Sequence, residues 1–127
     1  MRTKKIFTPL AAAALAACAT VSDSVADGSD VRLGQTAYID GPKIRPIAVI
    51  EDSRCPMNAR CVWAGQVRLK ALWVRPSGNQ EIELTLGKAK PLADGALTLT
   101  SVRPDKSTDR AIAPQDYRFS FSFAGGI

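Results

Sequence analysis

The residue types that could carry out chemistry are few in this chain. Its 127 residues include no histidine, which removes Ser-His and Cys-His nucleophiles and histidine acid–base catalysis. Glu81 and Glu83 form a carboxylate pair that a glycosidase could use. However, they alternate with Ile82 and Leu84 and therefore belong to the solvent face of a predicted strand, with Lys70 as a neighbour. No Ser-x-x-Lys motif or glycine-rich phosphate loop is present. We expect a protein that is not an enzyme and that uses no cofactor.

The N-terminal segment has the pattern of an export signal. Residues 1–5 are a short basic opening, and residues 6–17 are apolar apart from Thr8. This apolar run is too short for a bilayer span, which needs about 20 residues. An amphipathic helix is the alternative, but the segment has no polar face. Residues 1–17 are therefore predicted to be a signal peptide.

The end of this segment carries a more specific motif. Leu15-Ala16-Ala17-Cys18 resembles the bacterial lipobox. The resemblance implies cleavage before Cys18 and a lipid on its sulfur, which would anchor the protein to the membrane with two or three acyl chains. Ala19, rather than an aspartate, follows the cysteine and favours the outer membrane, with the protein facing the periplasm.

The two remaining cysteines are then a natural pair. If Cys18 carries lipid, Cys55 and Cys61 are left together in an oxidising compartment, where disulfides persist. A redox pair would have the C-x-x-C spacing, but five residues separate these two. Without histidine, two sulfurs also lack further zinc ligands. The spacing favours a structural disulfide and no metal site.

The cysteines lie in the most distinctive stretch of the chain. Asp52-Ser53-Arg54-Cys55-Pro56 and Cys61-Val62-Trp63-Ala64-Gly65 resemble a pattern in small exported bacterial β proteins, largely uncharacterised lipoproteins. A looser similarity covers Pro114-Gln115-Asp116-Tyr117. The resemblance implies the disulfide and a β fold, but no activity.

Two interpretations of this stretch remain open. In the structural one, Trp63 covers the disulfide or plugs the end of the core, and Arg54 pairs with Asp52 or Glu51. In the functional one, the stretch is a recognition loop. Its surface is formed by Asp52, Arg54, Arg60 and Trp63, since tryptophan and arginine are enriched in binding hot spots. The sequence favours the structural interpretation.

Net charge argues against nucleic acid as a partner. The formal charge is +5, from 17 basic and 12 acidic residues. Three basic residues, Arg2, Lys4 and Lys5, belong to the predicted signal peptide, so 14 against 12 leaves +2. The remaining basic residues are scattered rather than clustered, and we expect no nucleic-acid binding.

The rest of the chain divides into a tether and a single domain. Residues 18–30 comprise the lipidated cysteine and a small, polar, flexible tether, and residues 31–127 form one β domain. Apolar residues in the domain recur with a period of two, which predicts strands. The expected strands are 35–40, 43–52, 66–75, 80–86, 96–103 and a last one in which Tyr117, Phe119, Phe121 and Phe123 share a face. Residues 87–95 and 104–114 are expected to be loops, and Pro46 is expected at an edge or a bulge.

The best-defined local prediction is a hairpin around Pro76-Ser77-Gly78-Asn79. Pairing Arg75 with Gln80 places apolar residues opposite each other on one face. The three predicted pairs are Trp73–Ile82, Ala71–Leu84 and Leu69–Leu86.

Together, these patterns predict an all-β fold, a small antiparallel sandwich or partly closed barrel with one disulfide. The expected function is that of a non-enzymatic envelope lipoprotein that binds another envelope component, a protein or a glycan. The rival hypothesis is a proteinaceous inhibitor of an envelope-targeting hydrolase, a lysozyme or a protease, which rests on fold-level analogy.

Overall fold

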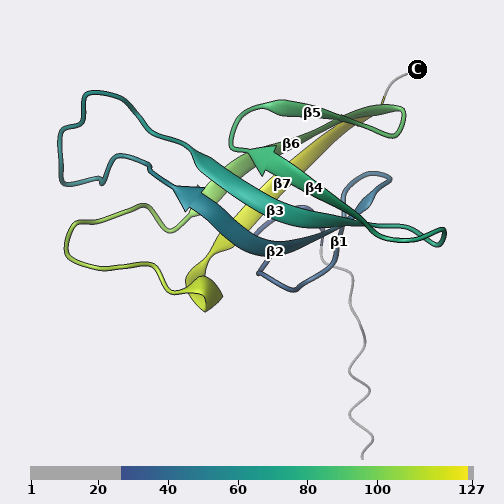
Figure 1. The fold of residues 1–127 in the computed structure, drawn as a ribbon, viewed down its shortest axis with the longest axis horizontal. Coiled ribbons are helices and arrows are strands. Elements are labelled where there is room, and N and C mark those ends of the chain that lie inside the picture. The colour runs from purple at the N-terminus through teal and green to yellow at the C-terminus, as the bar shows by residue number, and fades with distance from the viewer. Residues whose placement is uncertain (1–26, 126–127) are drawn as a thin grey trace, which may run out of the picture.

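Antiparallel strands make up nearly all the regular structure of this protein. The computed structural model describes residues 27–125 (Figure 1). Its elements are β1 (Ala37–Tyr38), β2 (Lys43–Asp52), β3 (Val67–Val74), β4 (Gln80–Thr85), β5 (Ala89–Leu92), β6 (Gly95–Arg103), a 3-10 turn η1 (Pro114–Asp116) and β7 (Arg118–Gly125). Within this part of the chain no helix is long and apolar enough to cross a membrane.

The strands form two sheets that enclose one core. The first sheet has the order β1-β2-β3-β4 and the second the order β5-β6-β7, with every pair antiparallel. The sheets lie in two layers that are not closed into a barrel (Figure 1). The all-β sandwich prediction is therefore confirmed. The core comprises Val31, Ala37, Ile39, Ile44, Val67, Leu69, Ala71, Ile82, Leu84, Leu92, Leu97, Leu99, Val102, Tyr117, Phe119 and Phe121.

The alternation of side chains explains why these segments are strands. In β3, Val67, Leu69 and Ala71 are fully buried, while the residues between them are only partly covered. In β7, Phe119 and Phe121 are buried in the same alternating way. Successive side chains of a strand point to opposite faces, so each strand contributes one apolar face to the core.

The predicted hairpin exists, but its predicted register is wrong by two residues. Trp73 lies opposite Gln80 rather than Ile82, and Ala71 lies opposite Ile82. The reason is that β3 ends at Val74: the carbonyl of Arg75 accepts a hydrogen bond from the N–H of Gly78 at 3.0 Å and closes the turn instead of extending the ladder. Because the shift is an even number, the apolar residues keep the predicted face.

Two further features bear on the predictions: an extra strand, β5, and a bulge in β2. Residues 87–95 were expected to be a loop, but Ala89–Leu92 form β5, which pairs with β6. The alternation there is hidden because Lys90 and Pro91 interrupt it. The bulge expected at Pro46 is confirmed, since the pairing of β2 with β3 shifts between Pro46 and Ala48.

The domain begins earlier than residue 31. The carbonyl of Gly28 accepts a hydrogen bond from the N–H of Phe121 at 2.7 Å, and Val31 forms an antiparallel bridge with Phe119. The last residues of the predicted tether, 28–30, therefore lie against β7. The predicted signal peptide and Cys18 lie outside the described residues.

The two ends of the sandwich differ in what they carry. β2 runs from Lys43 at one end to Asp52 at the other, and β3 runs back. The connection between them, residues 53–66, projects beyond the strands at the left of Figure 1. The turns around Gly41 and Gly78 lie at the opposite end. β7 begins near the disulfide loop and ends at the opposite end. Gly28 lies beside Phe121 and Val31 beside Phe119, so the chain runs from residue 28 toward the disulfide loop, and its first described residues lie nearer the opposite end.

Candidate functional site: the disulfide loop

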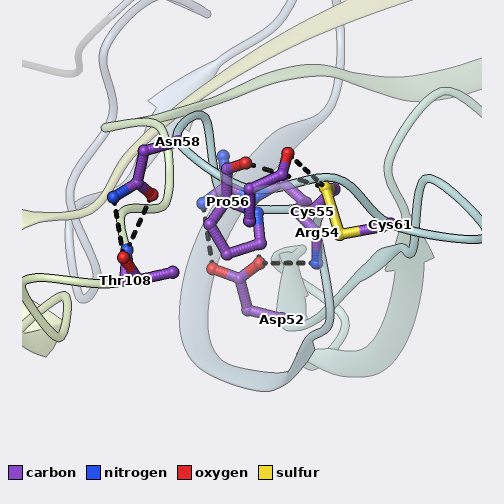
Figure 2. Close-up of a disulfide and its surroundings, with 8 residues drawn as sticks. Asp52, Arg54, Cys55, Pro56, Asn58, Cys61 and Thr108 are labelled. Carbon is purple, nitrogen blue, oxygen red and sulfur yellow. Dashed lines mark hydrogen bonds and ion pairs between the residues drawn. A yellow bond between two sulfur atoms is a disulfide. The ribbon is translucent and has the colours of Figure 1, made fainter.

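Residues 53–66, here called the disulfide loop, extend the β2–β3 hairpin beyond the sheet. The N–H of Ser53 donates to the carbonyl of Gln66 at 2.9 Å, and the N–H of Cys55 donates to the carbonyl of Ala64 at 3.1 Å. Cys55 and Cys61 are joined by the predicted disulfide, with their Cα atoms 5.8 Å apart (Figure 2). The loop is therefore fixed both at its base and at its tip.

Glycine is required at the base of this loop. Gly65 has φ +73°, and a Cβ at this position would overlap the carbonyl of Ser53 on the facing segment. Only a residue without a side chain allows the two segments to approach this closely.

Asp52, Arg54 and Tyr117, here called the Asp52 cluster, connect the loop to both sheets. The Nε of Arg54 donates to Oδ1 of Asp52 at 2.8 Å, and Nη2 donates to Oδ2 at 2.9 Å, a bidentate ion pair (Figure 2). The hydroxyl of Tyr117 donates to the same Oδ2 at 2.8 Å. Arg54 also donates to the carbonyls of Val102 and Pro104, at 2.9 and 3.1 Å. One guanidinium thus holds three segments together.

The charges of this cluster are set by their partners. Burial acts to raise the pKa of Asp52, but the hydrogen bonds from Arg54 and Tyr117 outweigh it and lower that pKa below its ordinary value. The hydrogen bond to Asp52 raises the pKa of Arg54. Burial, and then the hydrogen bond to the Asp52 carboxylate, raise the pKa of Tyr117 to about 12. At neutral pH the cluster is a carboxylate, a guanidinium and a neutral phenol.

A second loop, residues 104–113, supports the disulfide loop from the side. The N–H of Met57 donates to the carbonyl of Lys106 at 2.8 Å, and the ammonium of Lys106 donates to the carbonyl of Asp52 at 2.7 Å. Asn58 and Thr108 form two reciprocal hydrogen bonds, at 2.7 and 3.0 Å (Figure 2). These contacts order the backbone of the disulfide loop although little of it is buried.

The tip of the loop leaves large apolar side chains in solvent. Met57 is 71% exposed, Val62 105% and Trp63 64%, the three most exposed large apolar side chains of the described residues. The prediction that Trp63 plugs the end of the core is wrong, because its side chain is largely exposed and does not pack against the core. The loop that carries it projects past the ends of the strands (Figure 1). Arg60 is exposed as well.

The four predicted recognition residues therefore divide into two pairs. Asp52 and Arg54 point inward and position the loop, as the structural interpretation expected, whereas Arg60 and Trp63 point outward. The sequence interpretation missed Met57 and Val62, although apolar residues in a loop without strand periodicity were a usable signal. It also missed the hydroxyl of Tyr117, whose contact with Asp52 spans 65 positions and has no local signal.

The carboxylates considered for glycosidase chemistry lie elsewhere and are paired. Glu83 binds Arg68 at 2.6 Å and Glu81 binds Lys70 at 3.3 Å on the exposed face of the first sheet. Lys70 is thus the neighbour that the sequence predicted. In residues 27–125 no three metal-ligating side chains are grouped.

The disulfide loop is fixed at its base and exposes several large side chains. Its backbone is held by the disulfide and by hydrogen bonds at its base, and its exposed side chains include Met57, Val62 and Trp63 together with Arg60. The neighbouring Asp52 carboxylate and Tyr117 phenol are engaged in internal hydrogen bonds. Comparison of the chain with protein-family models, curated proteins and solved structures found no match.

Proposed function

We propose that this protein is a lipid-anchored envelope protein whose β domain binds another envelope component through the tip of the disulfide loop. One observation carries the proposal: Met57, Val62 and Trp63 are the most exposed large apolar side chains of residues 27–125, and all three lie on one stapled loop. Single exposed apolar residues are ordinary, but a cluster of them marks interaction surfaces.

The rigidity of the loop supports a binding role. A partner gains free energy by covering apolar surface, about 25 cal/mol per Å². Part of such a gain is normally lost in ordering the side chains and loops of the interface. Here the disulfide, the Asp52 cluster and the Asn58–Thr108 hydrogen bonds have already ordered the backbone. Trp63 and Arg60 at the tip are residue types that dominate binding energy in interfaces.

The placement of the loop fits attachment through the N-terminus. The described chain begins toward the end of the sandwich opposite the disulfide loop. A lipid on Cys18, expected from Leu15-Ala16-Ala17-Cys18, would attach the domain to the membrane from that end. The tip of the loop would then face away from the membrane, toward periplasmic components.

The test is an affinity capture with matched variants of the full-length lipidated protein. Wild type, a tip variant with Val62→Ser and Trp63→Ser, and a control with Ile47→Ser and Ile50→Ser are cross-linked in intact envelopes. The control removes exposed apolar side chains from β2, 38% and 45% exposed, outside the loop. We expect a component that is recovered with wild type and control and is lost with the tip variant. Equal recovery by all three proteins would contradict the proposal.

A second candidate is favoured by the shape of the loop. A projecting, disulfide-closed segment with exposed side chains can enter the cleft of an enzyme, which a flat surface cannot. The partner would then be a hydrolase that attacks the envelope, a lysozyme or a protease. Stoichiometric inhibition by wild type that is lost in the tip variant would support this candidate, and no inhibition across a panel of both enzyme classes would remove it.

A further inference from the structure

The end of the sandwich opposite the disulfide loop contains a cavity. Its volume is about 660 Å³, within the range of about 300–1,000 Å³ that is usual for small-molecule sites. The turn before β2, the end of β3, the β5–β6 turn and the end of β7 surround it. Its apolar part is formed by Pro42, Trp73, Val74, Pro76 and Phe123. The side chains of Trp73 and Phe123 are partly buried and pack against the core, which fixes their positions.

Four charged side chains line the same cavity: Asp40, Lys43, Arg75 and Asp94. Among the described residues, none of the four is part of an ion pair. The guanidinium of Arg75 lies over the ring of Trp73, 4.4 Å from its centroid. Its Nε donates to the carbonyl of Gly78 at 3.3 Å, while its terminal amino groups have no acceptor in residues 27–125. Arg75 therefore covers one face of Trp73, and the four charged groups at the cavity are not paired with one another.

The balance of these charges limits what the cavity can accept. Two carboxylates disfavour an anionic ligand, two cations disfavour a cationic one, and the four groups sum to zero. A neutral molecule that is rich in hydroxyl groups satisfies both kinds, because a hydroxyl donates to a carboxylate and accepts from a guanidinium or an ammonium. A sugar ring adds apolar C–H faces that can pack on an aromatic side chain.

The surface next to the cavity suits a chain of such rings. A neighbouring hollow of about 460 Å³ is lined by Asp27, Tyr38 and Phe121, and it shares Asp40 with the cavity. Tyr38 is 51% exposed and presents a further aromatic surface there. Asp40 therefore stands between two adjoining hollows, each with an aromatic wall.

We infer that this end of the domain binds a neutral oligosaccharide, with one sugar ring against Phe123 and with hydroxyl groups held by Asp40, Asp94 and the Arg75 guanidinium that lies over Trp73. This site is distinct from the disulfide loop. It therefore stands whether or not the loop binds a partner.

The chain provides its own reporter for the test. It contains two tryptophans, so Trp63→Phe leaves Trp73 as the only one, and its fluorescence reports on the cavity. The full-length protein is purified in a polyoxyethylene ether detergent, because alkyl glycosides carry a sugar. Cellotetraose, maltotetraose and the tetramer of N-acetylglucosamine are each titrated to about 10 mM, which saturates a site whose Kd is about 1 mM.

We expect a saturable change in Trp73 emission with at least one of the three oligosaccharides. Asp40→Asn and Arg75→Gln, made in the Trp63→Phe background, should each weaken binding roughly 10- to 100-fold, because each removes hydrogen bonds to a charged group. Asp116→Asn, which removes an exposed carboxylate near the other end, should leave the Kd unchanged. Unchanged unfolding midpoints in urea show that the variants are folded.

Three results would overturn the inference. The first is no saturable response to any of the three oligosaccharides. The second is binding that Asp40→Asn and Arg75→Gln leave unaltered, which would place the sugar elsewhere. The third is a response confined to the zwitterion D-alanyl-D-alanine or to laurate, titrated in parallel, which would assign the cavity to a different class of ligand.

Discussion

Replacing Arg54 by methionine is the most informative perturbation of this structure. Methionine keeps much of the length of the side chain but removes all four hydrogen bonds that the guanidinium donates to Asp52, Val102 and Pro104. Asp52 retains the hydroxyl of Tyr117 as a donor, but it loses its only salt-bridge partner among the described residues. The variant therefore leaves a carboxylate in a poorly hydrated place without a cation.

The expected cost follows from how little solvent reaches this pair. The side chains of Arg54 and Asp52 are 14% and 8% exposed. Removing one partner of a buried ion pair costs about 3–5 kcal/mol, and the remaining solvent contact places this pair at the lower end, about 3 kcal/mol. The matched control is Arg68→Met. Arg68 pairs with Glu83 and Glu51 on the solvent face of the first sheet, where water screens such pairs so that they contribute little.

Equilibrium unfolding in urea measures both variants on the same scale. Arg54→Met should lower the free energy of unfolding by about 3 kcal/mol, and Arg68→Met should lower it much less, because its ion pairs are exposed to solvent. Adding Asp52→Asn should cost less in the Arg54→Met background than in wild type, because it removes the unpaired carboxylate. If Arg54→Met were no more destabilising than Arg68→Met, the Asp52 cluster would not be what fastens the disulfide loop to the two sheets.

Three further predictions concern the same loop and its base. Replacing both cysteines of the disulfide by serine should lower the free energy of unfolding by about 2.4 kcal/mol, measured in urea, because the disulfide restricts the unfolded chain. A loss near zero would contradict a stabilising disulfide. Tyr117 should ionise at about 12 in an alkaline absorbance titration, a step that Tyr117→Phe removes. Because the pKa of Tyr117 in the folded state is above the ordinary 10.0, the stability that the neutral phenol contributes to the folded protein is fully present below pH 10. This contribution is lost as the pH rises toward 12. An ionisation of Tyr117 near 10 would refute its burial against Asp52. Gly65→Ala should destabilise the protein more than Gly34→Ala in urea, since both have positive φ but only Gly65 faces backbone atoms, and equal effects would contradict the close approach.

Local patterns were sufficient for most of the strands, but not for β5 or for the strand ends. The alternation of Val67, Leu69 and Ala71 fixed the face of β3 correctly, because a period of two depends only on neighbouring residues. The register of the hairpin depended on where the turn closes. The hydrogen bond from Gly78 to the carbonyl of Arg75 decides that point, and a sequence pattern does not contain it.

Some features of the candidate site could also be predicted from the sequence, and others could not. The pairing of Cys55 with Cys61 followed from their number and spacing, and Asp52 next to Arg54 was a visible opposite-charge pair. The exposure of Trp63 could not be predicted, because it depends on how the loop lies relative to the rest of the domain, which is a tertiary property. The cavity next to Trp73 was missed for a similar reason: its walls come from four segments, two turns and two strand ends, that are distant in the chain.

Site-specific photo-cross-linking in intact cells tests directly whether the tip of the disulfide loop is the binding surface. A photoreactive phenylalanine derivative is placed at Val62, at the tip of the disulfide loop, or at Ile50, an exposed apolar position of β2 outside it. We expect a discrete adduct from Val62 that is absent from Ile50. An adduct from Ile50 without one from Val62, or none from either position, would contradict the assignment of the loop as the binding surface.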